Sequence, residues 1–474
     1  MDFLDTFILE AGAQDAIGAL PNPRPAGAET RLPQGASDDG AAILPLLPVS
    51  RSEAYAKPYF CPGAIQAGRP QCGLERCRPC MDSKLAQSPS PQTAVLAESP
   101  IRISRVQGTR DRDAFVRLPW EIYRGDAQWV PPLVAERKEF INPRVHPFYR
   151  HGAAAQFLAH RDGQVVGRIQ ASDDPHYNAE HDSNLGCFGL FESIDDEEVA
   201  QTLFEAAADW LRARGRTQIM GPVDYSTNYA CGLLIDGFDT PPRIMMNHNP
   251  PYYAALLEAC GLSKAKDLYS WWFDDRQDVL EAWRTKAERL AARGRFDIRP
   301  FRMSDFDAEI ERCKQVYNAA WERNWGFVKM SDAEFAYLAK HLRQLAQPEL
   351  LLLAEVEGRA VGFSMTLPDL NEAIRPLNGR LCRWGLPIGL VRLLYNLRHV
   401  RSCRLLTLGV VEGFRRRGIS ELLILRTLDY GKNVARFTGA ELGWTLEDNE
   451  LINRTILAVG GQRYKTYRIY QREL

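Results

Sequence analysis

The sequence lacks the features of a membrane-spanning or secreted protein. Although 45% of its 474 residues are hydrophobic, no segment approaches the ~20 consecutive apolar residues that a membrane-spanning helix needs. The first eleven residues contain Asp2, Asp5 and Glu10 but neither Lys nor Arg, so they do not resemble a signal peptide. We therefore expect a cytoplasmic protein.

Net charge is almost absent as well. The 59 Lys and Arg residues are balanced by 60 Asp and Glu residues, which gives a formal charge of -1. Such a chain has no overall basic field to attract nucleic acid, so we expect no nucleic-acid partner. The length allows a sizeable core and predicts two domains.

Cysteine occurs ten times, in two kinds of context. Cys61, Cys72, Cys77 and Cys80 cluster in a segment rich in Pro and Gly. Their spacing suits a zinc ion or an iron–sulfur cluster, but the segment has no helix or strand pattern, and the alternative is four unrelated thiols. We predict no metal site. The other six cysteines are expected to be reduced and buried: Cys187, Cys231, Cys260, Cys313, Cys382 and Cys403.

The chain divides into a leader and a patterned region. Pro, Gly, Ser and Ala are frequent in residues 12–98 and no periodicity is sustained there, which predicts a disordered leader over 1–98. Patterned sequence begins at Ile101 and contains a weak internal repeat. We therefore predict two related halves, at 99–275 and 276–474.

The repeat is clearest in two hairpins and two helices. Residues 156–167 and 351–362 align at an offset of 195, each with an acidic residue and Gly between alternating apolar residues. Segments 249–261 and 449–461 each predict a helix that begins at an N-capping Asn, ends at Gly and precedes a Tyr-rich strand. The resulting order of strands and helices predicts an α/β fold with mixed central sheets flanked by helices.

The segment most informative about function is 405–420. An apolar strand ends in a short turn with Arg415, Arg416, Arg417 and Gly418, and a helix begins near Ile419. Unpaired N–H groups and the positive dipole end at a helix start would hold a pyrophosphate, and the arginines add charge. The alternative is an ordinary strand–helix turn with solvated arginines.

This segment resembles the acetyl-coenzyme A loop of the GNAT superfamily of N-acyltransferases, which reads Arg/Gln-x-x-Gly-x-Gly/Ala. Arg415, Gly418 and Ser420 match it, and Asn449 with Gly460 matches the helix that follows in the family. The resemblance covers about the last 180 residues. It implies acyl-coenzyme A as a co-substrate, with no permanently bound cofactor. It also implies that the cofactor-binding residues are Leu408, Val410, Arg415, Arg416, Arg417, Gly418, Ile419, Ser420 and Asn449.

Catalytic groups are harder to choose. By the family's logic an amine attacks the thioester as a free base, and Glu447 and Glu412 are the carboxylates nearest the expected site, although either also suits a structural role. Many GNAT enzymes place an acidic Tyr where this chain has Ile456, and no acid acts from there. Tyr464 or Tyr467 could substitute, or could simply pack on a terminal strand.

The first half has lost the cofactor turn. After its strand come Asp195, Asp196, Glu197 and Glu198, which suit a helix start but repel a pyrophosphate. We expect this half to be structural or to shape the acceptor pocket. His176, His181 and His248 could reach that cleft, or could be structural histidines.

An apolar insertion gives a clue to the acceptor. Residues 384–401 contain Trp384 and three arginines. This composition is compatible with a helix at a membrane interface, a lid over an apolar substrate or a helix docked on the other half. The region from Ile101 onward also resembles a bacterial family of tandem GNAT-like proteins that includes ceramide synthases. That resemblance implies a sphingoid-base amine as acceptor; a small amine, or a non-catalytic acyl-coenzyme A sensor, are the alternatives. The strings that carry it are Leu118–Tyr123, Trp129–Leu133, Asp236–Pro242 and His248–Tyr253.

Overall fold

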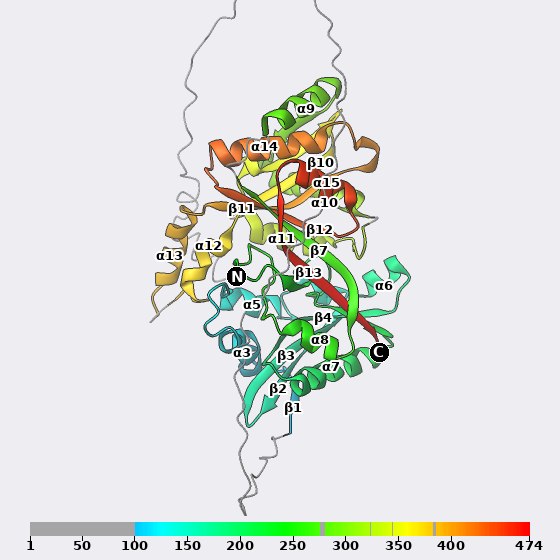
Figure 1. Ribbon diagram of the computed structural model, residues 1–474, viewed down its shortest axis with the longest axis vertical. Helices are drawn as coiled ribbons and strands as arrows, with labels where there is room; N and C mark the ends of the chain where they lie inside the picture. The colour runs from blue at the N-terminus through cyan, green and yellow to red at the C-terminus, as the bar shows by residue number, and fades with distance from the viewer. Residues whose placement is uncertain (1–99, 275–279, 323, 344, 383–384) are drawn as a thin grey trace, which may run out of the picture. The chain divides into compact units, whose positions relative to one another are not determined.

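The computed structural model describes residues 100–474 apart from 275–279, 323, 344 and 383–384 (Figure 1). The predicted leader and its four clustered cysteines lie outside the described residues, as does Trp384. The described residues belong to one compact unit.

The first half alternates strands and helices, broadly as predicted. Its elements are β1 (Arg102–Arg105), α3 (Thr109–Arg117), α4 (Pro119–Ile122), α5 (Val134–Phe140), η1 (Pro147–Arg150), β2 (Ala153–Arg161), β3 (Gln164–Asp173), α6 (Pro175–His181), β4 (Leu185–Ser193), α7 (Glu197–Arg212), β5 (Gln218–Gly221), β6 (Leu233–Asp236), α8 (Tyr253–Ala259) and β7 (Ser263–Asp274).

The second half follows the same order, with an insertion between its third and fourth strands. Its elements are α9 (Leu280–Arg293), β8 (Asp297–Pro300), η2 (Met303–Asp305), α10 (Phe306–Trp321), α11 (Asp332–Arg343), η3 (Pro348–Leu350), β9 (Leu351–Val356), β10 (Arg359–Pro368), α12 (Leu370–Ile374), η4 (Arg375–Leu377), α13 (Ile388–Leu397), β11 (Ser402–Val410), η5 (Glu412–Phe414), α14 (Ile419–Asn433), β12 (Gly439–Leu446), α15 (Glu450–Ala458) and β13 (Gln462–Glu473).

Among the described residues, thirteen strands form one sheet in which the two halves exchange their last strands. The order runs β1-β2-β3-β4-β5-β13-β7-β12-β11-β10-β9-β8, with β6 beside β13. Thus β13, from the end of the chain, completes the first half against β5, and β7 completes the second half against β12. Figure 1 shows the two long exchanged strands side by side along the middle of the sheet. The boundaries at 275 and 276 remain predictions, because one continuous sheet crosses them.

Helices cover both faces of the sheet, as expected for this fold class. In the second half, Leu352 of β9 packs in one core cluster with Leu423 of α14. The next residue, Leu353, packs with Val316 of α10 in another cluster. Because adjacent strand residues point to opposite faces, α10 and α14 lie on opposite sides of the sheet.

Local signals succeeded at the hairpins, but neither predicted Asn caps its helix: Asn449 occupies the N-cap position of α15 without a capping bond. Asp162 and Gly163, like Glu357 and Gly358, have positive φ, as a two-residue hairpin turn requires. Asn249, however, does not cap α8: the prediction was wrong, because its side chain bonds the backbone of Leu234 on β6 instead.

Candidate active site

The site begins where β11 and β12 separate. The two strands run parallel and pair from Ser402 opposite Gly439 to Leu405 opposite Leu442. Beyond that point β11 stays beside β10 and β12 stays beside β7, so a gap opens between them. Gly443, with a φ of +45°, lies at the divergence, where β12 also bulges against β7.

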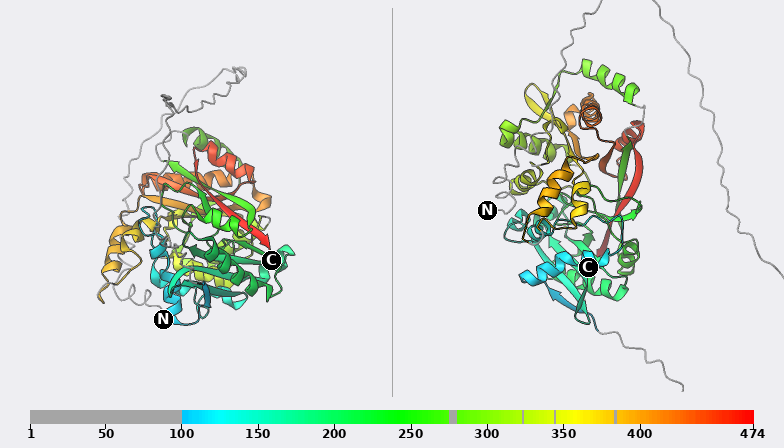
Figure 2. Two further views of the ribbon diagram at one scale, coloured as in Figure 1. Left: turned by 60° about the horizontal axis from the view of Figure 1, so that its bottom comes forward. Right: turned by 90° about the vertical axis from the view of Figure 1, so that its left-hand side faces the viewer.

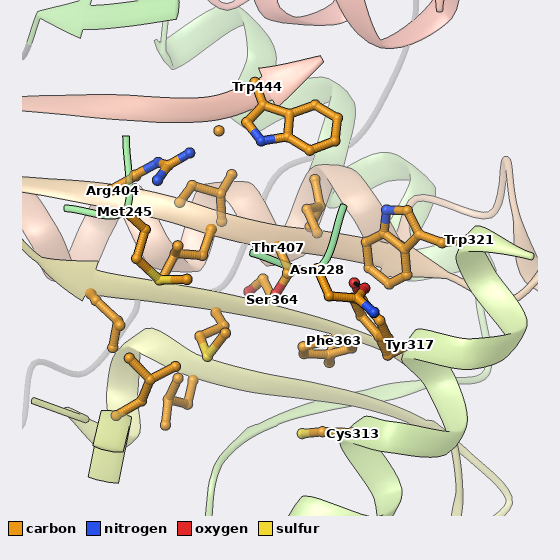
Figure 3. A pocket seen from close by; sticks show the side chains of 18 of the residues that line it. Asn228, Met245, Cys313, Tyr317, Trp321, Phe363, Ser364, Arg404, Thr407 and Trp444 are labelled. Carbon is orange, nitrogen blue, oxygen red and sulfur yellow. Dashed lines mark hydrogen bonds between the residues drawn. The ribbon is translucent and has the colours of Figure 1, made fainter. Parts of the chain in front are cut away.

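A cavity of about 360 Å³ lies at this gap (Figure 3). Its lining comes from both faces of the sheet: Ile424 of α14 and Ile456 of α15 on one side, and Tyr317 and Trp321 of α10 on the other. The lining is mainly apolar or aromatic and continues between α10 and α11. We call this space the first cavity. An elongated molecule could cross the sheet through it.

The turn after β11 presents backbone donors at one end of this gap. Arg416 and Gly418 have φ values of +63° and +89°. Gly418 is the N-cap of α14 and provides no side-chain cap. Because Leu422 makes the first bond back to Gly418, the N–H groups of residues 419–421 have no partner within the helix. With exposed Arg416 and Arg417 beside it, the turn has the backbone donors and the positive charge that binding an anion requires.

Arg415 differs from its neighbours because its side chain is hydrogen-bonded to the backbone. Its Nε donates to the Val410 carbonyl at 3.0 Å, and its Nη2 donates to the Ala320 carbonyl at 2.8 Å. The side chain thereby ties the end of β11 to the end of α10 and positions the turn. The Val410 carbonyl is consequently engaged, whereas Leu408 lines the first cavity.

The helix α15 contributes two of the singled-out residues. Asn449 lies at its N-cap position but makes no capping bond with its side chain, and it lines the first cavity. Ile456 is buried and lines the same cavity, so an apolar side chain stands where many GNAT enzymes have a tyrosine.

The predicted catalytic groups do not line the first cavity. Glu447 accepts from Lys264 Nζ at 2.6 Å and from the Asp267 backbone at 3.1 Å, which fits a structural carboxylate. Glu412 is exposed in η5. Tyr464 is largely buried, and burial together with the Glu441 carboxylate raises the pKa of its hydroxyl. All three assignments remain predictions.

Sequence reasoning missed a buried ionisable pair at the base of the gap. Arg404 of β11 lies opposite Glu441 of β12 in the parallel ladder, and Arg404 lines the first cavity. Glu441 is 0% exposed, and burial raises the pKa of its carboxyl to about 7 although Arg404 opposes the rise. A single charge within each of two apolar strands was the signal that could have revealed the pair.

A second cavity, of about 590 Å³, lies in the first half and against the insertion. Four residues line both cavities: Tyr229, Met245, Leu338 and Leu342. The two spaces therefore adjoin.

The predicted histidines are separated by the fold. His248 lines the second cavity, with its Nε2 2.7 Å from Asp126 Oδ2. His181 contacts the Phe327 carbonyl with its Nε2. His176 stacks on His151 and, with Asp174, forms a group whose ligand atoms lie within 4.8 Å of one another. Neither His176 nor His181 lines either cavity.

The chain is similar to several known proteins in sequence or in structure. No family model matches the chain. The chain is 37% identical over 366 residues to "Bacterial ceramide synthase" of Caulobacter vibrioides (strain NA1000 / CB15N). This alignment covers 76% of this chain and 94% of that protein. It is 33% identical over 369 residues to "Protein YghO" of Escherichia coli (strain K12), covering 77% and 93%. A solved tandem GNAT protein from the clavulanic acid biosynthesis pathway matches with 13% identity and a TM-score of 0.47, over 79% of this chain and 98% of that one.

The chain is an N-acyltransferase in which two related halves share one sheet. At the identity and coverage just given, the chain belongs to the family of the bacterial ceramide synthase.

Proposed function

We propose that this enzyme transfers a long-chain acyl group from acyl-coenzyme A to the amine of a sphingoid base. The observation that carries the proposal is the first cavity, which lies where β11 and β12 separate and continues into an apolar space between α10 and α11. The relationship to a protein named as a ceramide synthase supports the choice of acceptor.

In this proposal the cofactor lies along the gap between β11 and β12. Arg416, Arg417 and the N–H groups at the start of α14 bind the pyrophosphate. The pantetheine arm passes Leu408, and the acyl chain lies against aromatic and aliphatic side chains of α10 and α11. Those side chains include Phe306, Ile310 and Phe335.

The reaction needs few polar groups. The amine nitrogen attacks the thioester carbon, the carbon–sulfur bond breaks, and coenzyme A leaves as the thiolate. The attacking amine must lose a proton, and a carboxyl with a pKa near the working pH suits that task. We propose that Glu441 accepts this proton, because it lies between the cavity-lining residues Arg404, opposite it in the ladder, and Leu442, next to it in the chain, and burial raises the pKa of its carboxyl to about 7. A coenzyme A thiolate is a tolerable leaving group, so Ile456 in place of a tyrosine does not prevent the step.

The insertion supports a lipid acceptor. Helix α13 turns Leu390 and Leu393 inward, and both line the second cavity. Its other face exposes Val391 (65%) and Tyr395 (64%), followed by exposed Arg398. The right-hand view of Figure 2 shows α12 and α13, in yellow and orange, on the side facing the viewer. No helix among the described residues is long and apolar enough to cross a bilayer.

We infer that this face of α13 contacts an anionic membrane surface, because apolar side chains flanked by arginines complement such a surface. The six described cysteines are free, but the prediction that all are buried was wrong, because Cys382 is exposed and Cys313 is only partly buried.

The proposed activity is tested by incubating the protein with acyl-coenzyme A thioesters from acetyl to stearoyl and a sphingoid base. We expect thiol release coupled to amide formation only with long acyl chains. Mass spectrometry detects the amide. Amide from acetyl-coenzyme A and small amines would replace the proposal with a small-amine acetyltransferase. Binding without turnover of any amine would favour an acyl-coenzyme A sensor.

The membrane contact predicts that Val391→Glu with Tyr395→Glu abolishes co-sedimentation with vesicles containing phosphatidylglycerol. The reason is that two carboxylates would enter an anionic interface. The matched control is Leu451→Glu with Leu457→Glu, because these leucines are equally exposed on α15, at 70% and 56%. Loss of vesicle binding in both variants, or in neither, would refute a contact through α13.

A further inference from the structure

The second cavity occupies the place in the first half that the first cavity occupies in the second half. Strand β4 lies between β3 and β5, as β11 lies between β10 and β12. Strands β4 and β5 pair only as far as Cys187 opposite Met220, and β4 then runs on to Ser193. Leu190 and Glu192, on that extension, line the second cavity. The repeat has therefore placed a chamber beside each diverging strand.

The first-half chamber has no place for a pyrophosphate. At the start of α7, Asp196 caps the helix by accepting from the Val199 N–H at 3.1 Å, and Glu197 and Glu198 follow in the first turn. A capped, acidic helix start repels an anion. This chamber can therefore take an alkyl chain but not a second coenzyme A.

The walls of the chamber suit such a chain. At its outer end the lining is apolar and comes from the insertion: Ile374, Leu381, Leu390, Leu393, Leu394 and Leu397. Its volume of about 590 Å³ falls within the ~300–1,000 Å³ usual for ligand sites. At its inner end it meets the first cavity at Tyr229 and Met245. A chain lying in it would have one end at the thioester and the other at α13.

A buried carboxylate lies close to that inner end. Asp224 is 5% exposed and lines the chamber, and its backbone N–H donates to the Ala230 carbonyl, next to Tyr229. One carboxylate oxygen accepts from the Leu190 N–H at 3.0 Å. Burial raises the pKa of Asp224 to about 6, although Arg137 and Arg168, which also line the chamber, oppose the rise.

We propose that the second cavity holds the alkyl chain of the acceptor amine, with the ammonium group beside Asp224 and the chain directed toward α13. This inference rests on the proposed function. The acyl chain and the acceptor chain then occupy separate chambers, one in each half, and their lengths are selected independently. The face of α13 opposite the chamber is the one that we place against the membrane.

Leu394→Trp tests the chamber, because Leu394 lines it without belonging to a core cluster. We expect turnover of long-chain amines to fall at least about 10-fold while short-chain amines react as before, since an added ring fills space that the chain needs. The preference for acyl chain length should not change. The matched control is Ala339→Trp, because Ala339 lines only the first cavity and belongs to no core cluster; it should shorten the preferred acyl chain and leave the amine preference unchanged.

The outcomes separate this inference from the proposed function. An unchanged amine profile in active Leu394→Trp, or a shift in its acyl preference, would overturn the assignment of the chamber while leaving the activity intact. Native mass spectrometry with sphinganine gives a readout without turnover. Binding to the wild type that Leu394→Trp removes would support the chamber even if no amide formed.

Asp224→Asn tests the position of the amine. Asparagine retains an oxygen for the Leu190 N–H but removes the charge. The KM for the amine should rise about 10-fold with the KM for acyl-coenzyme A unchanged. Equal changes in both constants, or in neither, would place the ammonium group elsewhere.

Discussion

Arg416→Glu combined with Arg417→Glu is expected to weaken coenzyme A binding by about 100-fold or more, because two charge-assisted contacts become repulsive. Both side chains are exposed beside the turn, so folding should not change. Titration calorimetry with coenzyme A measures the affinity, and circular dichroism checks the fold. Arg415 is left in place, because its bonds to Val410 and Ala320 hold the turn.

A matched control exists at two other exposed arginines. Arg359→Glu with Arg436→Glu changes the net charge by the same amount, and Arg436, like Arg416, has a positive φ. Its affinity for coenzyme A should stay close to the wild-type value. If both double variants bind equally well, the turn before α14 is not the pyrophosphate site.

Arg404→Met should destabilise the protein by about 1–2 kcal/mol more at pH 8 than at pH 5.5, because a buried carboxylate loses its nearest cation and must take up a proton instead. The effect has a definite pH dependence. The folded-state pKa of Glu441 is raised to about 7 from a usual value of 4.5, so the native state holds this proton more tightly than the unfolded state. Stability is therefore highest below about pH 4.5 and falls as the pH rises through 7. Thermal unfolding at pH 5.5 and pH 8 should show the larger loss at pH 8.

The double variant Arg404→Met with Glu441→Gln distinguishes this cause from simple loss of packing. It should recover most of the stability at pH 8 and show little pH dependence, since the ionisable carboxyl is gone. A double variant as unstable as the single one would mean that Arg404 acts through its bond to Ile244 instead. Glu441→Gln alone also tests the proposed proton acceptor, because its turnover should lose the rise with pH around 7.

Much of the fold could be predicted because its signals are local. Asp162–Gly163 and Glu357–Gly358 specified their hairpins, and the arginine turn specified the start of α14. The exchange of β7 and β13 could not be predicted, because it depends on which of two similar sheets a strand joins. The prediction that Asn249 caps α8 was wrong for a similar reason. N-capping preferences depend on residues that are neighbours in sequence, whereas Asn249 bonds to Leu234, which is its neighbour only in the folded structure.

The site was predictable only where backbone geometry determines it. A glycine turn before a helix leaves N–H groups free whatever surrounds it, so the start of α14 at Gly418 could be predicted, while the binding of an anion there stays a prediction. Catalytic groups depend on burial and on long-range neighbours. Glu447 was chosen from its position along the chain, but Lys264 and Asp267 hold it away from the first cavity. Glu441 was passed over, since burial alone gives it an unusual pKa.

The strand exchange also constrains how this chain can fold and be dissected. Tyr470, near the C-terminus, lies opposite Gly221, and Ala440 lies opposite Phe273. Contacts between such distant residues slow folding, because a long loop must close before they form. The first half emerges from the ribosome with the edge of β5 unpaired until the last strand is made, and such an edge invites aggregation. Neither half expressed alone would present a complete sheet, so the smallest stable piece of this enzyme spans both.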